Sequence, residues 1–152
     1  MASSIHHKLD LSVLQYMFHS PNGAVAKDLM KRGARVESRA KRNVSGIGGS
    51  GPKRVDTGHL RSSINHKLVI RPEGFSVRVG TNVYYARWVH DGTGLYGPKH
   101  MVIKPKRAKA MVWRSKLHGH KTGKFAGFVV SKSTKGMRPN PFLAAALPAF
   151  RN

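Results

Sequence analysis

The charge of this chain constrains its fold more than any other feature of its sequence. Its 152 residues include 28 lysines and arginines but only six aspartates and glutamates, so the net charge is +22 at pH 7. Self-repulsion of this size opposes compaction and favours a polyanionic partner. Nucleic acid is the first candidate for that partner, an acidic protein surface the second and a membrane surface the third.

The length and composition are nevertheless compatible with one folded domain. Apolar residues make up 39% of the chain, and a chain of this length buries about 68–70% of its unfolded surface. Its apolar runs are far shorter than the roughly 20 residues of a membrane span. The N-terminal MASSIHHKLDL lacks the apolar stretch of a secretory signal. The absence of cysteine excludes disulfides and thiolate chemistry, and it fits a reducing cytoplasm.

The ionisable residues form no recognisable catalytic or metal site in the sequence. The acidic residues are scattered singly, which gives poor support to acid–base or metal-dependent hydrolysis. The serines at 62 and 63 lack the Gly-x-Ser-x-Gly pattern of a nucleophile elbow. His118 and His120 could align with His100, but Gly119 and the flanking lysines favour a mobile loop over a zinc site. We therefore predict no catalytic residue, no cofactor and no bound metal.

The glycine-rich segment GIGGSGPKR, residues 46–54, could be a phosphate-binding loop or a flexible connection. A P-loop follows a strand, precedes a helix and ends in Gly-Lys-Ser/Thr. Here a predicted helix comes first, Pro52 follows Gly51, and the next residues VDTGHLRSSI do not begin as a helix. We therefore predict a flexible loop over 45–54 and a second mobile loop over 117–126, both of which become ordered in an assembly.

Residues 24–43 have the spacing of an amphipathic helix. Small apolar residues fall within an arc of about 80° on one face. They are Val25, Leu29, Gly33, Val36 and Ala40. This composition favours close packing against a neighbouring backbone. Two i, i+4 ion pairs, Asp28 with Arg32 and Glu37 with Lys41, would support the helix.

The opposite face of this helix carries cations that follow one another at spacings of four, four and three. They are Lys31, Arg35, Arg39 and Arg42. Like charges at such spacings cost roughly 0.2–0.5 kcal/mol per pair. Two interpretations remain open. The face is either simply solvated, or it contacts DNA phosphates or an acidic patch on a neighbouring protein.

Most of the remaining pattern predicts strands. Residues 64–70 and 75–81 form a hairpin around the turn RPEG. Three further strands are expected in HMVIKP, AKAMVWRS and FVVSK. Tyr85, Trp88 and Val89 have the helical spacing of a core or a subunit interface, which we favour over base stacking.

These elements predict an α+β fold with a long N-terminal helix, an antiparallel sheet of four to five strands and a short C-terminal helix. Residues 9–19 fit a short strand or a short helix, and Ser20 and Pro21 fit the cap and first turn of the next helix. Asn140 and Pro141 are expected to play the same roles for the last helix. We expect one domain over residues 1–152, with a helical part about 10–44, the loop 45–54, a sheet part 55–135 and a helix about 140–150.

Three blocks of sequence together resemble a known family. VDTGHLRSSI at 55–64 is followed by VGTNVYYARWVHDGTG at 79–94, and RPNPFLAAAL stands at 138–147. Their order and spacing are similar to the tailed-bacteriophage neck family of tail-component, tail-completion and head–tail joining proteins. The motif residues that match are Asp56, Thr57, Gly58, Leu60, Arg61, Ser63, Ile64, Val79, Gly80, Thr81, Asn82, Tyr85, Ala86, Gly92, Thr93, Pro141, Phe142 and Leu143.

Two features depart from the family pattern. His90 and Asp91 occupy the stretch before Gly-Thr in which the family often has an acidic residue, so a shared salt bridge does not follow. The insertion KLHGHKTGKFAG is long and very basic for the family. In the first block, we expect Asp56 and Thr57 to accept hydrogen bonds from nearby backbone N–H groups. Arg61 would pair with Asp56 or with a neighbour's carboxylate, unless the block is only a local cap.

The resemblance implies a structural virion subunit without catalysis. It implies a homo-oligomeric ring at the head–tail junction, with a hexamer favoured and a dodecamer as the open alternative. The partners would be connector and tail proteins, with genomic DNA in the channel and no membrane. Assembly would take place in the cytoplasm of the bacterial host. Two alternatives stay open: a tail terminator that caps the tail tube, and a free basic nucleic-acid-binding protein.

Overall fold

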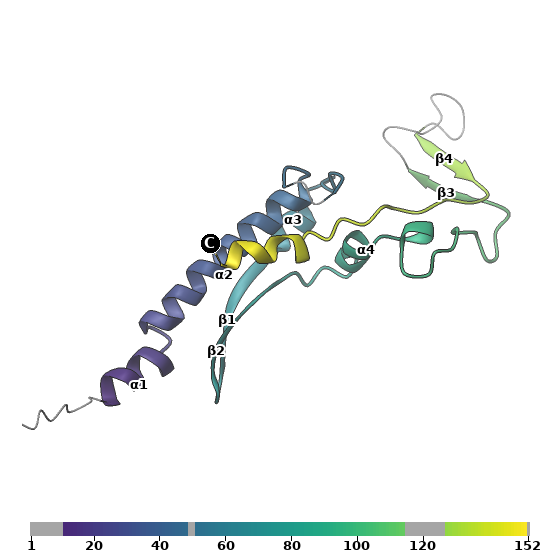
Figure 1. Cartoon of the computed structure of the whole chain (residues 1–152). Helices are drawn as coiled ribbons and strands as arrows, with labels where there is room; N and C mark the ends of the chain where they lie inside the picture. The colour runs from purple at the N-terminus through teal and green to yellow at the C-terminus, as the bar shows by residue number, and fades with distance from the viewer. Residues whose placement is uncertain (1–10, 49–50, 115–126, 152) are drawn as a thin grey trace, which may run out of the picture.

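The computed structural model of the chain describes residues 11–48, 51–114 and 127–151. Figure 1 shows an elongated molecule with two helices at one end and a small β-hairpin at the other. The chain exposes 11881 Å² of surface, whereas a compact protein of 16.8 kDa exposes about 7,700 Å². The predicted loop 117–126, together with His118 and His120, lies outside the described residues.

The N-terminal end is helical. α1, Leu11–His19, is a helix, which resolves the choice left open by the sequence. α2, Ala24–Val44, covers the predicted helix. Its N-cap is Gly23 rather than Ser20, because the Ser20 hydroxyl accepts a hydrogen bond from the Asn22 N–H within the connecting turn. Pro21 lies in that turn and not in the first turn of α2.

The small-residue face of α2 packs against a β-hairpin. β1, Asn65–Arg71, and β2, Gly74–Gly80, are antiparallel and pair from Asn65 opposite Gly80 to Arg71 opposite Gly74. A Cβ at Gly33 would lie 2.5 Å from Cγ1 of Val77. Glycine at this position therefore lets the helix backbone approach the sheet closely, which confirms the packing predicted for this face.

The segment between the glycine-rich loop and the hairpin contains a helix that was not predicted. α3, His59–Ser63, is one short turn with Leu60 buried. Gly58 precedes it at a φ of +83°, in the left-handed region that glycine adopts without strain. Five residues are too few for an apolar period, so this helix leaves no pattern in the sequence.

The four described strands form two hairpins and not one sheet. β3, Met111–Arg114, pairs with β4, Phe128–Ser131, at the far end of the molecule (Figure 1). The predicted strand HMVIKP is not a strand, since only Ile103 forms a bridge, to Thr134. Pro98 precedes this segment and Pro105 ends it, and neither proline can donate to a ladder. Strand number and antiparallel pairing agree with the prediction, and the class is α+β.

The C-terminal segment ends in a 3-10 helix. η2, Ala144–Phe150, starts after Leu143. Asn140 does not cap it, which corrects the prediction, because its side chain is buried and donates to the carbonyls of Asn43 and Pro52. Pro141 begins the turn that leads to η2, and its carbonyl accepts a hydrogen bond from the Ala145 N–H over 2.9 Å.

The hydrophobic core lies where α2, α3, α4 and the C-terminal segment meet. α4, Ala86–Asp91, follows the hairpin and is followed by a 3-10 turn, η1, Gly94–Tyr96. The buried residues of this core are Val36, Ala40, Val44, Leu60, Ile64, Ala86, Val89, Phe142 and Ala146. This core is small for the chain, and large parts of the molecule lie outside it.

Candidate interaction site

The three motif blocks, distant in sequence, come together around the core. The Ser63 hydroxyl lies 2.6 Å from Oγ1 of Thr81, which joins the first block to the second. Oγ1 of Thr81 also accepts a hydrogen bond from the Val83 N–H over 3.2 Å. Leu60 and Ile64 of the first block and Phe142 of the third are buried in the same core. These motif residues therefore hold the fold together.

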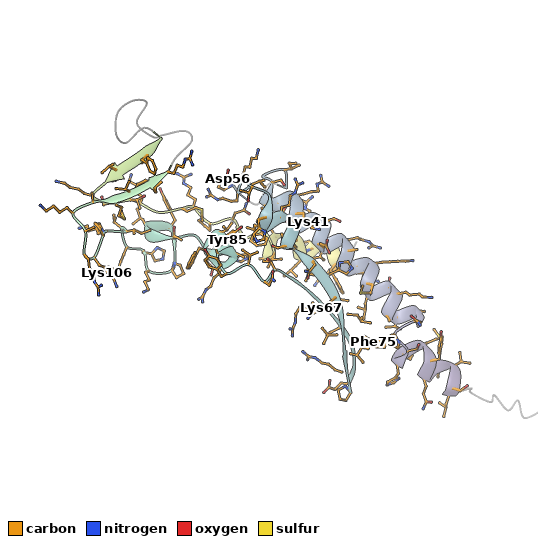
Figure 2. The ribbon with its side chains drawn as sticks, turned by 180° about the vertical axis from the view of Figure 1, so that it is seen from behind. Lys41, Asp56, Lys67, Phe75, Tyr85 and Lys106 are labelled. Atoms are coloured by element: carbon orange, nitrogen blue, oxygen red, sulfur yellow. The ribbon has the colours of Figure 1, made fainter. Side chains whose placement is uncertain are left out.

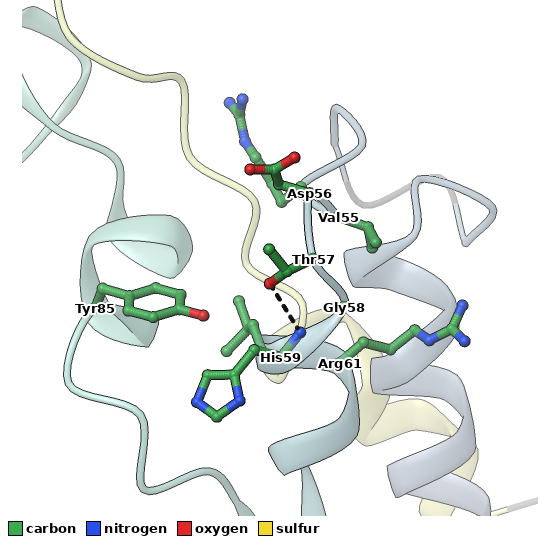
Figure 3. Close-up of a pocket in the computed structure, with 9 residues that line it drawn as sticks. Val55, Asp56, Thr57, Gly58, His59, Arg61 and Tyr85 are labelled. Atoms are coloured by element: carbon green, nitrogen blue, oxygen red, sulfur yellow. Dashed lines mark hydrogen bonds between the residues drawn. The ribbon is translucent and has the colours of Figure 1, made fainter. Parts of the chain in front are cut away.

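A cavity of about 260 Å³ lies between the first block and the second. It is lined by Arg54, Val55, Asp56, Thr57, Gly58, His59, Leu60, Arg61 and Tyr85. Figure 3 shows Tyr85 facing Thr57 and His59 across it. Oγ1 of Thr57 accepts a hydrogen bond from the His59 N–H over 3.4 Å, as expected for a helix start.

One of the two pairings predicted for Arg61, the ion pair with Asp56, is not present in the structure. Figure 3 shows its side chain directed away from Asp56. Both side chains are exposed. The predicted pair between Arg61 and Asp56 is therefore not formed, because the two residues lie on opposite sides of the turn around Gly58. The guanidinium remains accessible to a carboxylate on another molecule.

Two buried asparagines connect the third block to α2: Asn43, which the sequence did not single out, and Asn140, which was predicted only as a helix cap. Nδ2 of Asn43 donates to the Phe142 carbonyl over 3.0 Å. Nδ2 of Asn140 donates to the Asn43 carbonyl over 3.2 Å and to the Pro52 carbonyl over 3.0 Å. The Asn140 N–H donates to the Val89 carbonyl over 2.9 Å. The ends of the glycine-rich loop are thus fixed to the C-terminal segment.

The Gly-Thr pair at the end of the second block starts an arm that leaves the core. Oγ1 of Thr93 accepts a hydrogen bond from the Met137 N–H, and the Thr93 N–H donates to the Met137 carbonyl, each over 2.9 Å. Gly92 and Gly136 have positive φ, and a Cβ on either would clash with the backbone opposite. We call residues 93–138 the distal arm, and the other described residues the body.

An apolar groove of about 540 Å³ lies where α4 meets the distal arm. Its exposed apolar residues are Trp88, Met101, Val102 and Ile103. Trp88 is 53% exposed and stacks edge to face on Tyr84. Of the three aromatic-segment residues predicted to be in a core or interface, only Val89 is buried, Tyr85 is half-buried, and Trp88 faces outward.

Asp91 lies at the edge of this groove within an ion-pair cluster. Its Oδ1 lies 2.8 Å from Nδ1 of His90, and its Oδ2 lies 3.6 Å from Nε of Arg87. The His90 hydrogen bond and the charges of His90 and Arg87 lower the pKa of Asp91. The stretch that departs from the family pattern therefore has an acidic residue with its own partners.

The remaining predicted site residues lie on the surface or at its edge. Gly80 ends β2, Asn82 is exposed in the turn before α4, and Leu143 packs partly against the core. The cations of the α2 stripe are all exposed: Lys31, Arg35, Arg39 and Arg42. On the flanks of α2 both predicted ion pairs are present, Asp28 with Arg32 at 2.7 Å and Glu37 with Lys41 at 2.5 Å.

Neither a metal site nor a membrane span is found in the described part of the chain. Over residues 11–48, 51–114 and 127–151, no three histidine, cysteine or acidic side chains gather as metal ligands would. Within the same ranges, no helix has both the length and the apolar character needed to cross a bilayer.

Comparison with known families identifies the segment that carries the first two motif blocks. Residues 23–92 match the family described as "Bacteriophage HK97-gp10, putative tail-component". Residues 23–92 are therefore similar to a bacteriophage tail-component family. The resemblance inferred from the motif blocks is thereby confirmed for this part of the chain. No match was found among curated proteins or among solved structures.

The tail-component segment coincides with the packed part of the molecule. It includes α2, the β1–β2 hairpin and α4, and it ends at Gly92 where the distal arm begins. Most residues of the core belong to it, the exceptions being Phe142 and Ala146. The distal arm, α1 and the C-terminal segment with η2 all lie outside the match.

Proposed function

We propose that the chain is a structural subunit of a bacteriophage neck, assembled as a ring around the DNA channel between head connector and tail. The tail-component match over residues 23–92 supports a virion protein with a structural role rather than an enzymatic one. The large exposed surface supports assembly, because a subunit retains surface that its neighbours cover. A ring of six copies is the arrangement we favour.

Two exposed apolar surfaces, far apart on the molecule, carry this proposal. α1 has no buried residue, although most of its side chains are large and apolar. The exposed ones are Leu11, Val13, Tyr16, Met17 and Phe18. A helix of nine residues is marginal in water without a partner surface. The groove beside Trp88 offers such a surface near the other end of the molecule.

The occupant of the groove in this proposal is α1 of a neighbouring copy. Residues 11–26 contain no Lys, Arg, Asp or Glu. Two copies with a charge of +22 each repel one another, so a contact through an uncharged helix minimises that repulsion. A contact between unlike surfaces repeats from copy to copy, and it closes into a ring when the rotation permits.

The oligomeric state of the purified chain tests the proposal. Light scattering after size exclusion is expected to give a closed oligomer for the natural chain and a monomer for Tyr16→Ser combined with Phe18→Ser. Trp88→Ser, on the groove side, is expected to have the same effect. Ile70→Ser is the matched control, because Ile70 is equally exposed on the β1–β2 hairpin. A natural chain that stays monomeric, or an oligomer that survives both groups of changes, contradicts the proposed interface.

Position in the particle tests the neck assignment against the tail terminator. Images of virions are expected to show the ring at the head–tail junction and absent from tails purified without heads. A ring on headless tails would instead support the terminator. Arg61→Ala adds a test of the motif surface, and it is expected to reduce particle assembly more than the stability of the isolated chain.

A further inference from the structure

The distal arm is a double-stranded extension of the body that is held mainly by backbone hydrogen bonds. Beyond its base, the Leu95 N–H donates to the Lys135 carbonyl over 2.8 Å. Ile103 and Thr134 exchange two hydrogen bonds of 2.9 Å, and the arm ends in the β3–β4 ribbon. Figure 2 shows Lys106, in the arm, at the opposite end of the molecule from Phe75.

The arm carries charge of one sign only. From Gly92 to Asn152 the sequence contains no Asp or Glu, so every acidic residue of the chain lies before the arm. All the lysines and arginines in the described part of the arm are exposed. They are Lys99, Lys104, Lys106, Arg107, Lys109, Arg114, Lys132, Lys135 and Arg138. Within the described residues, each salt bridge is in the body and none includes an arm cation.

From this arrangement we infer that the distal arm binds the phosphate backbone of double-stranded DNA. Unpaired cations on a projecting element release counterions when they approach a polyanion, and the affinity grows with each phosphate that is neutralised. Duplex DNA presents such phosphates at high density, with one charge per roughly 1.7 Å of axis. A two-stranded ribbon such as β3–β4 also has a width that the major groove admits.

The composition of the arm favours DNA over an acidic protein. Lysines outnumber arginines among its cations, and protein interfaces are depleted in lysine. Arg138 is set apart, since its guanidinium stacks 5.5 Å from the ring centre of Tyr96. The cations at 104, 106, 107 and 109 lie together in the exposed segment that precedes β3. This segment is the centre of the inferred contact.

The test compares two variants of equal charge on the full chain. The arm variant is Lys104→Gln, Lys106→Gln, Arg107→Gln and Lys109→Gln. The matched control is Lys27→Gln, Lys53→Gln, Lys67→Gln and Arg71→Gln, which removes three exposed lysines and one exposed arginine from the body. Binding to a 30-bp DNA duplex is measured by fluorescence anisotropy at several salt concentrations.

The arm variant is expected to bind at least about 10-fold more weakly at 0.1 M salt, and its log–log salt slope should fall by about 3.6 units for four lost phosphate contacts. The control should retain its affinity within about threefold. Equal losses in both variants would mean that net charge alone attracts DNA, which overturns the inference. Tighter binding of a single strand of the same length, or of poly-L-glutamate of equal charge, would also overturn it.

Acetylation footprinting of the unmodified chain gives a second readout that does not depend on the folding of a variant. Bound duplex should protect Lys104, Lys106 and Lys109, while Lys27 and Lys67 stay reactive. The inference extends the proposed function to its DNA contact, yet the two fail separately. An oligomer without arm-dependent DNA binding refutes the inference alone. Arm-dependent binding by a chain that forms no oligomer refutes the proposed ring alone.

Discussion

The body and the distal arm reach their structures by different physical means. In the described residues, every buried hydrophobic side chain lies in the body, together with all the acidic residues of the chain that the structure describes. The arm has paired backbone and glycines at its base, and no hydrophobic side chain of its described residues is fully buried. The fold of the body thus depends on buried hydrophobic side chains. The arm depends on backbone hydrogen bonds, so its exposed positions can be occupied by lysine and arginine.

The largest difference between the two regions is expected in the free energy of unfolding, when a large side chain is removed from each. Phe142→Ala is expected to lower the free energy of unfolding by about 3–5 kcal/mol, because Phe142 is fully buried and its ring contacts His90 edge to face. Trp113→Ala in the arm should cost less than about 1 kcal/mol, since Trp113 is partly exposed. Urea unfolding measures both. Equal losses would mean that the arm contributes to the core.

The next largest effect is expected at the base of the arm. Gly136→Ala places a Cβ against the Thr93 carbonyl at a φ of +86°, which should cost about 1–3 kcal/mol and loosen the arm locally. Amide hydrogen exchange should accelerate at Leu95 and Ile103 and stay unchanged in α2. Gly127→Ala is the matched control, because Gly127 has a φ of +77° but no atom near its Cβ position. If both variants open the arm equally, the close approach at Gly136 is not what holds it.

A smaller effect is expected at Glu37, where α2 meets β1. Its carboxylate accepts from Nζ of Lys41 and lies 2.5 Å from Nδ1 of His66. Burial alone would raise the pKa of Glu37, but the hydrogen bonds and charges of Lys41 and His66 outweigh it and lower the pKa below 4.5. The stabilisation is therefore present above the unfolded pKa and is lost as pH falls through the folded pKa.

Glu37→Gln should consequently lower the free energy of unfolding by about 1 kcal/mol at pH 7. The difference from the natural chain should shrink toward zero as pH falls through the lowered pKa of Glu37. Glu73→Gln, in the exposed turn between β1 and β2, is the control and should have little effect at either pH. A penalty for Glu37→Gln that persists in acid would assign the loss to packing and not to charge.

The smallest effect on stability is expected in the α2 stripe. Arg39→Gln removes the charge repulsion between residue 39 and its neighbours Arg35 and Arg42. The free energy of unfolding should therefore rise by a few tenths of a kcal/mol. The function of the α2 stripe is tested in phage particles that carry Arg35→Gln together with Arg39→Gln. Loss of DNA from filled heads with tails attached would make the stripe a second DNA contact beside the arm. Loss of tail attachment would indicate an acidic neighbour, and normal particles a solvated face.

The sequence predicted the elements with local periodicity and missed those that depend on distant partners. α2 and the β1–β2 hairpin follow from patterns that repeat every few residues. α3 is too short to show such a period, and its start depends on the backbone of Gly58. Asn43 and Asn140 are joined by a hydrogen bond across 97 residues. Asn43 therefore has no local signal, and the local pattern at Asn140 suggested a helix cap instead. The sequence predicted one sheet, but the described strands form two separate hairpins. Strand propensity alone does not show which strands pair with one another.

The candidate surfaces show the same division. Family motif blocks indicated residues that matter, yet many of them, such as Thr81 and Phe142, serve the core. The excess of lysine and arginine is evident from the composition of the chain. Their concentration on one projecting element depends on hydrogen bonds between residues 93–103 and 134–137, which no local pattern reveals.

The base of the arm has a further consequence for how such a chain can change over evolutionary time. Thr93 and Met137 are hydrogen-bonded neighbours, so the chain leaves the body and returns to it at one place. A segment with adjacent ends can be lengthened, shortened or exchanged without moving the residues on either side. An arm of different length or charge can therefore be joined to the same body, so the surface inferred to contact DNA can change while the core stays the same.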